Sequence, residues 1–141
     1  MKKLILVGRS EAGKTTLTQR LRGQKIEYEK TQYVKFGDVI IDTPGEYAEN
    51  PELGRALALY SYEADIVGLL LSATEPYSLY PPCVAAVANR EVIGIVTKAD
   101  RSDARVDLAE MWLRLAGCEK IFVTSSYNDD GIGEILEYLS K

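Results

Sequence analysis

Between residues 8 and 15 the chain reads Gly8-Arg9-Ser10-Glu11-Ala12-Gly13-Lys14-Thr15. This is a glycine, four residues and then Gly-Lys-Thr, the spacing typical of loops that wrap a phosphate. The backbone N–H groups of such a loop point inward, and the N-terminus of the following helix adds partial positive charge. We expect Lys14 to contact the β- and γ-phosphates and the Thr15 hydroxyl to ligate Mg²⁺. The eight residues and Thr16 are predicted to bind a nucleoside triphosphate.

Short apolar runs alternate with amphipathic stretches on both sides of this loop. Apolar runs that are buried on both faces are typical of a parallel sheet covered by helices. The expected strands are Leu4–Val7, Tyr33–Phe36, Val39–Ile41, Ile66–Leu71, Val92–Val96 and Ile121–Val123. The Gly37-Asp38 turn makes a hairpin of two of them and so supplies one antiparallel edge strand. The sequence therefore predicts a single α/β domain over residues 1–141, with a six-stranded, mostly parallel sheet in three layers.

Helices are expected between these strands. The predicted ranges are Lys14–Arg22, Pro51–Tyr60, Pro82–Ala88, Ser102–Leu115 and Gly131–Leu139. Gly23 and Gly117 are expected to stop the first and fourth of them. The inner face of the fourth helix is predicted to hold Val106, Leu108, Met111, Trp112 and Leu115. Ligands of such sheets bind at the carboxyl ends of the strands, which is where each motif below falls.

Two segments are candidates for the metal and the γ-phosphate. Asp42-Thr43-Pro44-Gly45-Glu46 follows the third predicted strand, where Asp42 is suited to hold Mg²⁺ and the Gly45 N–H to sense the γ-phosphate. Thr31 lies in a polar segment whose hydroxyl is suited to complete the Mg²⁺ shell when that phosphate is present. The predicted catalytic set is Lys14, Thr31, Gly45 and Glu46, and the predicted Mg²⁺ ligands are Thr15, Thr31 and Asp42. The alternatives are a turn with a capping aspartate and a plain loop threonine.

A second group of residues is placed to read the base. Thr97-Lys98-Ala99-Asp100 ends the fifth predicted strand, and Asp100 is suited to accept hydrogen bonds from guanine N1–H and the 2-amino group. Adenine lacks both donors and would leave the carboxylate unpaired. Lys98 can lay its alkyl stem along the base, and backbone N–H groups of Thr124, Ser125 and Ser126 can meet the base carbonyl. The alternative for Asp100 is to cap the next helix, a role that Ser102 or Asp103 fits better.

Composition limits the partners. The net charge of −4 supplies no basic excess for a nucleic acid, and no apolar run is long enough to span a membrane. The chain has no histidine, which removes imidazole bases and His-ligated metals. Cys83 and Cys118 are expected to be buried free thiols, as in a reducing cytoplasm.

The phosphate loop, the switch threonine, Asp-Thr-Pro-Gly, Lys-x-Asp and Thr-Ser-x together resemble the small GTPase-like P-loop superfamily. Three segments resemble, more narrowly, the EutP/PduV-like family of P-loop proteins of ethanolamine and propanediol utilisation. They are Leu17–Gly23, Lys30-Thr31-Gln32 and Asp42–Tyr47. The resemblance implies a cytoplasmic bacterial protein at the shell of a microcompartment. The family has been linked both to GTP or ATP hydrolysis and to an acetate-kinase-like phosphotransfer.

The chain departs from the superfamily pattern at three positions. Thr97 stands where asparagine usually begins the base-reading motif, and the shorter side chain cannot make all the usual contacts. Glu46 replaces the glutamine that orients water in many relatives. Ser10 replaces a frequent glycine and would crowd an arginine supplied by a partner. These departures predict slow intrinsic turnover.

Three functions remain open from the sequence. The first is a slow GTPase switch. The second is an ATP-dependent phosphotransferase acting on a small carboxylate such as acetate, with Arg9 and Lys35 as candidate cations. The third is an adaptor that binds nucleotide for stability and docks on the shell. The tyrosines at 60, 62, 77 and 80 are then the contact surface, unless they pack the rim of the domain itself.

Overall fold

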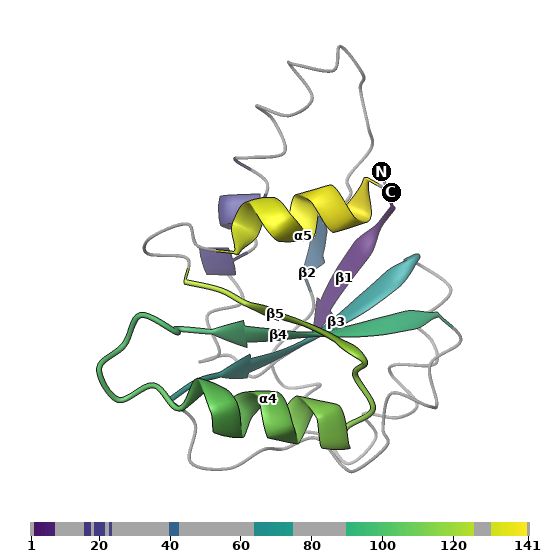
Figure 1. Cartoon of the computed structure of the whole chain (residues 1–141). Helices are drawn as coiled ribbons and strands as arrows, with labels where there is room; N and C mark the ends of the chain where they lie inside the picture. Colours follow the sequence, from purple (N-terminus) through teal and green to yellow (C-terminus); the bar gives the residue numbers. More distant parts are fainter. Residues whose placement is uncertain are drawn as a thin grey trace.

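Five parallel strands form the sheet in the part of the chain that the structure describes. This computed structural model describes residues 2–7, 16, 17, 19–21, 23, 40–42, 64–74, 90–125 and 131–140. The strands are β1 (Leu4–Val7), β2 (Ile40–Asp42), β3 (Ile66–Ser72), β4 (Glu91–Thr97) and β5 (Lys120–Val123). Their order is β2-β1-β3-β4-β5 and each neighbouring pair is parallel (Figure 1). The carboxyl ends of all five strands therefore lie at one edge of the sheet.

The strand predictions are confirmed to within one residue at each end, and so is the α/β class. The described residues contain five strands where six were expected. The remaining one, Tyr33–Phe36, lies outside the described residues with its antiparallel pairing. The predicted helices at 51–60 and 82–88 and the four tyrosines also lie outside them.

Helices cover both faces of the sheet, which gives the expected three layers (Figure 1). Alternate strand residues point to opposite faces. On one face, residues such as Ile5, Leu69 and Val96 pack with α4 (Val106–Leu115). On the other face, residues such as Leu6 pack with α5 (Ile132–Leu139) and with Leu17 and Leu21, two of the helical residues 16, 17, 19–21 and 23. Each of these buried aliphatic side chains contributes about 1.5–3 kcal/mol relative to an exposed one.

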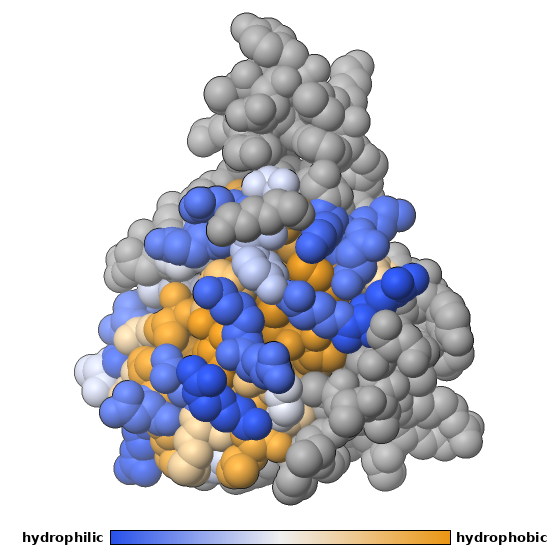
Figure 2. Space-filling view, turned by 45° about the vertical axis from the view of Figure 1, so that its right-hand side comes forward, coloured by the Kyte–Doolittle hydropathy of each residue, from blue (hydrophilic) through white to orange (hydrophobic). Residues whose placement is uncertain are grey.

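The prediction for α4 was wrong in two respects. The helix begins at Val106 rather than Ser102, and its N-cap residue is Arg105, which makes no side-chain cap. The residues that it buries fully are Ala109 and Leu113, whereas Met111 and Leu115 are 47% and 55% exposed. Val106 and Trp112 of the predicted face are partly buried and pack against the core, as expected. Figure 2 shows hydrophobic surface at the lower end of its view, the end at which α4 lies in Figure 1.

Gly94 explains which face of α4 is buried. A Cβ atom at Gly94 would lie 3.0 Å from Leu113 Cδ1 and 3.2 Å from Leu113 Cβ. The glycine therefore leaves room for Leu113 to lie directly on β4. This contact between a glycine of the sheet and Leu113 of the helix orients α4 so that Ala109 and Leu113 face inward.

Glycines lie at the end of α4 and at the start of α5, where the sequence places them, whereas the predicted stop at Gly23 is wrong. Gly117 has a φ of 107° and follows α4, and Gly131 has a φ of 79° and is the N-cap residue of α5. Both angles lie in the left-handed region that glycine adopts at little energetic cost. Gly23 is itself helical, so it does not stop the first helix as predicted.

The amino edge of the sheet is tied to α5. The Lys2 N–H donates to the Leu139 carbonyl at 2.8 Å, and the Lys3 N–H donates to the Asp65 carboxylate at 2.9 Å. The Tyr138 hydroxyl donates to Glu91, the first residue of β4. This hydrogen bond, followed by desolvation, raises the pKa of Tyr138 to about 12.

Candidate functional site

The predicted site residues divide into two groups. Most of the phosphate and catalytic set lies outside the described residues: residues 8–15, Thr31, Gly45 and Glu46, together with Ser126. The structure describes Thr16, Asp42, Thr97, Lys98, Asp100, Thr124 and Ser125. All but Thr16 lie in, or directly after, the carboxyl ends of β2, β4 and β5.

Both flanks of the glycine-rich sequence 8–15 are anchored in the core. Val7, the last residue of β1, is fully buried and pairs in register with Leu69 of β3. On the far side, Thr16 is exposed and helical, and Leu17 is fully buried against the α5 face. Asp42, the last residue of β2, stands in register with Leu6. The strand-to-helix context that a phosphate loop requires is therefore present around residues 8–15.

The segment from Thr97 to Arg105, which we call the base loop, forms backbone hydrogen bonds with the segment at Thr124 and within itself. The Ala99 N–H donates to the Thr124 carbonyl at 3.2 Å, which joins the two segments that the sequence predicts to read a base. Within the loop, the Arg101 N–H donates to the Lys98 carbonyl at 3.1 Å. The structure thus brings together residues that are more than 20 positions apart in the sequence.

Thr124 is the anchor of the second segment. Its backbone N–H and its hydroxyl both donate to the Val96 carbonyl, at 2.7 and 2.8 Å. Gly131 approaches from α5, where an added Cβ would lie 2.3 Å from the Val123 carbonyl oxygen. Thr124 and Ser125 are both buried, at 0% and 1% exposure. Their backbone is therefore held between β4 and the start of α5.

The base loop presents its side chains differently along its length. Thr97 is buried and Lys98 is half-buried with a φ of 59°, the one positive φ among the described non-glycine residues. Such a backbone is uncommon outside glycine and tends to occur at functional sites. Asp100 is exposed, and within the described part of the chain its carboxylate has no hydrogen-bond or ion-pair partner. Because the N-cap of α4 is Arg105, Asp100 does not cap that helix, and neither do Ser102 and Asp103.

One part of this edge was not predicted from the sequence. The turn Ser72-Ala73-Thr74 ends β3 and contacts the base loop: the Ala73 N–H donates to the Thr97 carbonyl at 2.8 Å. Ser72 is 1% exposed and stands in register with Thr97. The sequence does contain a signal for this contact, because two hydroxyl residues, Ser72 and Thr74, follow the apolar run Ile66–Leu71.

Two further observations concern the described residues alone. No group of three or more Cys, Asp and Glu side chains among them is arranged to hold a metal ion, and the predicted Mg²⁺ ligands Thr15 and Thr31 lie outside them. No helix in this part of the chain has the length and apolarity needed to cross a membrane.

Cys118 is a buried free thiol, as predicted, and burial raises its pKa to about 12. Cys83 lies outside the described residues.

Comparison with known proteins identifies relatives along the whole chain. The sequence profile of the PduV-EutP family, described as ethanolamine utilisation - propanediol utilisation, matches residues 1–141. The propanediol utilization protein PduV of Citrobacter freundii is 45% identical over 141 residues, which cover 99% of this chain and 94% of that protein. The probable acetate kinase EutP of Escherichia coli K12 is 32% identical, over 100% of this chain and 91% of that protein.

Solved structures show the same fold. The translation elongation factor SelB of Methanococcus maripaludis, in complex with the GTP analogue GppNHp, matches with a TM-score of 0.64 at 19% sequence identity. The match covers 99% of this chain and 33% of SelB, so the chain spans about a third of the elongation factor. The similarity shows that the fold is that of the P-loop GTPase domains.

Proposed function

Because the chain belongs to the PduV-EutP family of ethanolamine and propanediol utilisation proteins, we propose that it binds a nucleoside triphosphate with Mg²⁺, and that this nucleotide is GTP. The proposal places the protein in the cytoplasm, at the surface of the microcompartment in which that metabolism takes place. The nucleotide lies along the carboxyl edge of the sheet, from the glycine-rich sequence to the base loop.

The observation that carries the proposal is the hydrogen bond from the Ala99 N–H to the Thr124 carbonyl. It holds the Asp100 turn beside Thr124 and Ser125, at the sheet edge where β1 leads into residues 8–15. Two motifs that are distant in sequence are thus neighbours where a P-loop fold binds its ligand. This proximity supports the proposal that the two motifs contribute to one site.

The residues of the base loop suit guanine. Asp100 offers an exposed carboxylate without a partner among the described residues, and guanine N1–H and its 2-amino group are two adjacent donors. A hydrogen bond to a charged group is worth about 1.5–3 kcal/mol. Lys98 is half-buried on a left-handed backbone, with a long alkyl stem to lie along the base.

The phosphate end is assigned by residue chemistry. Residues 8–15 supply backbone N–H donors, Lys14 pairs with the β- and γ-phosphates, and Thr15, Thr31 and Asp42 hold Mg²⁺. Bound Mg²⁺ neutralises charge that develops on the phosphates. Gly45 and Glu46 then lie near the γ-phosphate. A carboxylate at Glu46 orients water poorly beside the negatively charged γ-phosphate, which favours a slow GTPase switch.

The test is a calorimetric titration of nucleotide-free protein with GTP and with ATP, each with Mg²⁺, for the wild type and for Asp100→Ala. We expect GTP to bind at least about tenfold more tightly than ATP, and the variant to lose that margin. Lys14→Ala should abolish binding of both nucleotides. Equal or tighter binding of ATP by the wild type would reject the assignment of GTP.

Phosphotransfer to acetate is a second candidate, favoured by the names of relatives. Probable acetate kinases EutP of Escherichia coli K12 and Salmonella typhimurium are 32% and 34% identical to this chain. Product analysis separates the two activities, because hydrolysis releases free phosphate and transfer forms acetyl phosphate. If Lys14→Ala abolishes nucleotide binding but leaves association with shell protein intact, the protein acts as an adaptor instead.

A further inference from the structure

We propose that Ser72 and Thr74, in the turn that ends β3, are positioning residues for guanine selection, which act through Ala73 on the base loop. The inference rests on the proposed function, because it concerns how Asp100 is held. It assigns a role to a segment to which the proposed function gives no contact with phosphate, metal or base.

The first step is that Ala73 holds the base loop at both ends. Its N–H donates to the carbonyl of Thr97, the first residue of the loop, at 2.8 Å. Its carbonyl accepts from the N–H of Arg105, the last residue of the loop, at 2.7 Å. A single residue of β3's turn therefore fixes the distance between the start and the end of the loop that carries Asp100.

The second step is that two hydroxyl groups hold Ala73 in place. The Ser72 hydroxyl accepts a hydrogen bond from the Thr74 N–H at 3.2 Å, and the Ser72 and Thr74 hydroxyl oxygens are 2.8 Å apart. Side-chain hydroxyls that bond the backbone two residues on stabilise turns of this kind. Since Ser72 is 1% exposed, water is poorly placed to replace its hydroxyl.

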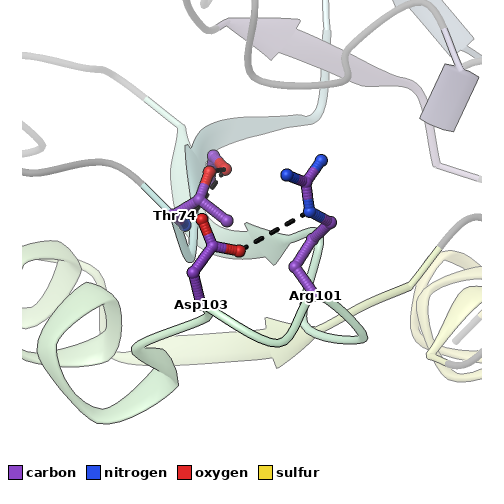
Figure 3. Close-up of polar contacts among 4 residues, drawn as sticks. Thr74, Arg101 and Asp103 are labelled. Atoms are coloured by element: carbon purple, nitrogen blue, oxygen red, sulfur yellow. Dashed lines mark hydrogen bonds and ion pairs between the residues drawn. The ribbon is translucent and has the colours of Figure 1, made fainter.

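The third step is that the ion pair within the loop contributes little to holding it. Figure 3 shows Arg101 and Asp103 rising from the loop on the side where Thr74 lies. Their ion pair has an Nε–Oδ1 distance of 3.6 Å, with both side chains more than half exposed. Exposed pairs of this kind add little to stability. Ala104 packs against the hydrophobic core, and the Ala99–Thr124 bond holds the middle of the loop, whereas the two Ala73 bonds join its first and last residues to β3.

The position of Asp100 therefore depends on the geometry of the β3 turn. If the turn relaxes, the loop keeps its Thr124 contact and gains freedom at both ends. A less well placed carboxylate loses hydrogen bonds to guanine, while the phosphate contacts at the other end of the nucleotide are unaffected. The signature is a loss of discrimination between bases, rather than a uniform loss of affinity.

A measurement on nucleotide-free protein tests the contact itself. Amide hydrogen exchange by NMR is compared in wild type, Ser72→Ala and Thr74→Val, at the Ala73 and Arg105 amides. We expect exchange about tenfold faster in Ser72→Ala, with a smaller effect in Thr74→Val and none in Thr74→Ser, which keeps the hydroxyl. Unchanged protection at both amides in Ser72→Ala overturns the inference, whatever nucleotide binds.

A titration with GTP and ITP tests the consequence, since inosine lacks the 2-amino group. The ratio of the two dissociation constants should fall by about threefold or more in Ser72→Ala, with ITP affinity retained. Tyr138→Phe removes a hydroxyl at the opposite edge and should leave the ratio at its wild-type value. An equal loss of affinity for both nucleotides in Ser72→Ala would mean a merely structural role. If wild-type protein binds neither nucleotide, the proposed function fails, and the exchange result still decides the contact.

Discussion

Gly131 links the start of α5 to the end of β5, and replacing it with alanine tests how close that contact is. The residue is the N-cap of α5, with φ 79° and ψ −12°. A Cβ atom there would lie 2.3 Å from the Val123 carbonyl oxygen and 3.2 Å from Thr124 Cα. Both atoms belong to the backbone, so no side chain can rotate away to make room.

The magnitude follows from two terms. A left-handed backbone costs an alanine about 1–2 kcal/mol relative to glycine. Forcing a methyl group into a filled site costs about 1–3 kcal/mol more, because either the helix start or the strand end must move. The free energy of unfolding should fall by about 2–5 kcal/mol, a large share of the 5–15 kcal/mol typical of a domain.

Urea unfolding measures the change in the free energy of unfolding caused by Gly131→Ala, and Gly133→Ala is the matched control. Gly133 lies two residues further on in α5, and a Cβ atom there would have no neighbour within 4 Å. Alanine at that position should raise the free energy of unfolding by about 0.5–1 kcal/mol, because glycine weakens a helix interior. With a typical slope, Gly131→Ala should lower the urea midpoint by about 1–2 M. If Gly131→Ala unfolds at the wild-type midpoint, the close approach between α5 and β5 is refuted.

Three further predictions concern the α4 layer. Gly94→Ala should destabilise the fold by about 1–3 kcal/mol through its contact with Leu113, and combining it with Leu113→Ala should give less than the sum of the two effects. Met111→Lys should change the free energy of unfolding by less than about 0.5 kcal/mol, whereas Leu113→Ala should lower it by about 2–5 kcal/mol. In a Cys83→Ser background, stability should decline from pH 9 to 12, and less steeply in Cys118→Ala. The folded protein keeps the Cys118 proton up to its pKa of about 12, while the unfolded chain loses it near the ordinary value of 9.0.

Each of these has an outcome that contradicts it. Strict additivity of Gly94→Ala and Leu113→Ala would mean that the two sites are not in contact. A loss of more than about 2 kcal/mol in Met111→Lys would place Met111 inside the core after all. An identical pH dependence with and without Cys118 would mean that its thiol titrates normally in the folded protein. Urea unfolding at pH 7 measures the first two, and urea unfolding between pH 7 and 12 measures the third.

The strands could be predicted from the sequence because both of their faces are buried. Runs such as Ile66–Leu71 have no polar face, which indicates a strand that is covered on both sides. In α4 the apolar residues outnumber the positions that the sheet can cover. Periodicity alone favours the larger side chains, including Met111 and Leu115. The structure buries Ala109 and Leu113 instead, because Gly94 opens space on β4, and a glycine on another element is invisible to the periodicity of the helix.

The candidate site shows the same division. The proximity of the Asp100 and Thr124 segments could be predicted because each follows an apolar run, and parallel strands bring such ends together. The start of α4 could not, because Ser102 and Asp103 have the chemistry of N-caps. Hydrogen bonds from Arg105 to Ala73 and from Arg101 to Lys98 hold that segment as a loop. The role of Ala73 lies in its peptide group, which carries no signal in the sequence.

The bond from Lys2 to Leu139 has a consequence for the order in which the protein can fold during synthesis. β1 is made early, but its Leu4 and Leu6 side chains are covered by α5, the last described element of the chain. The part of this face of the sheet that α5 covers, beside Leu17 and Leu21, therefore stays open on the ribosome until residues 131–140 have emerged from the exit tunnel. Nascent chains stalled before that point should bind chaperones that recognise exposed aliphatic surface, and release should follow once α5 has docked.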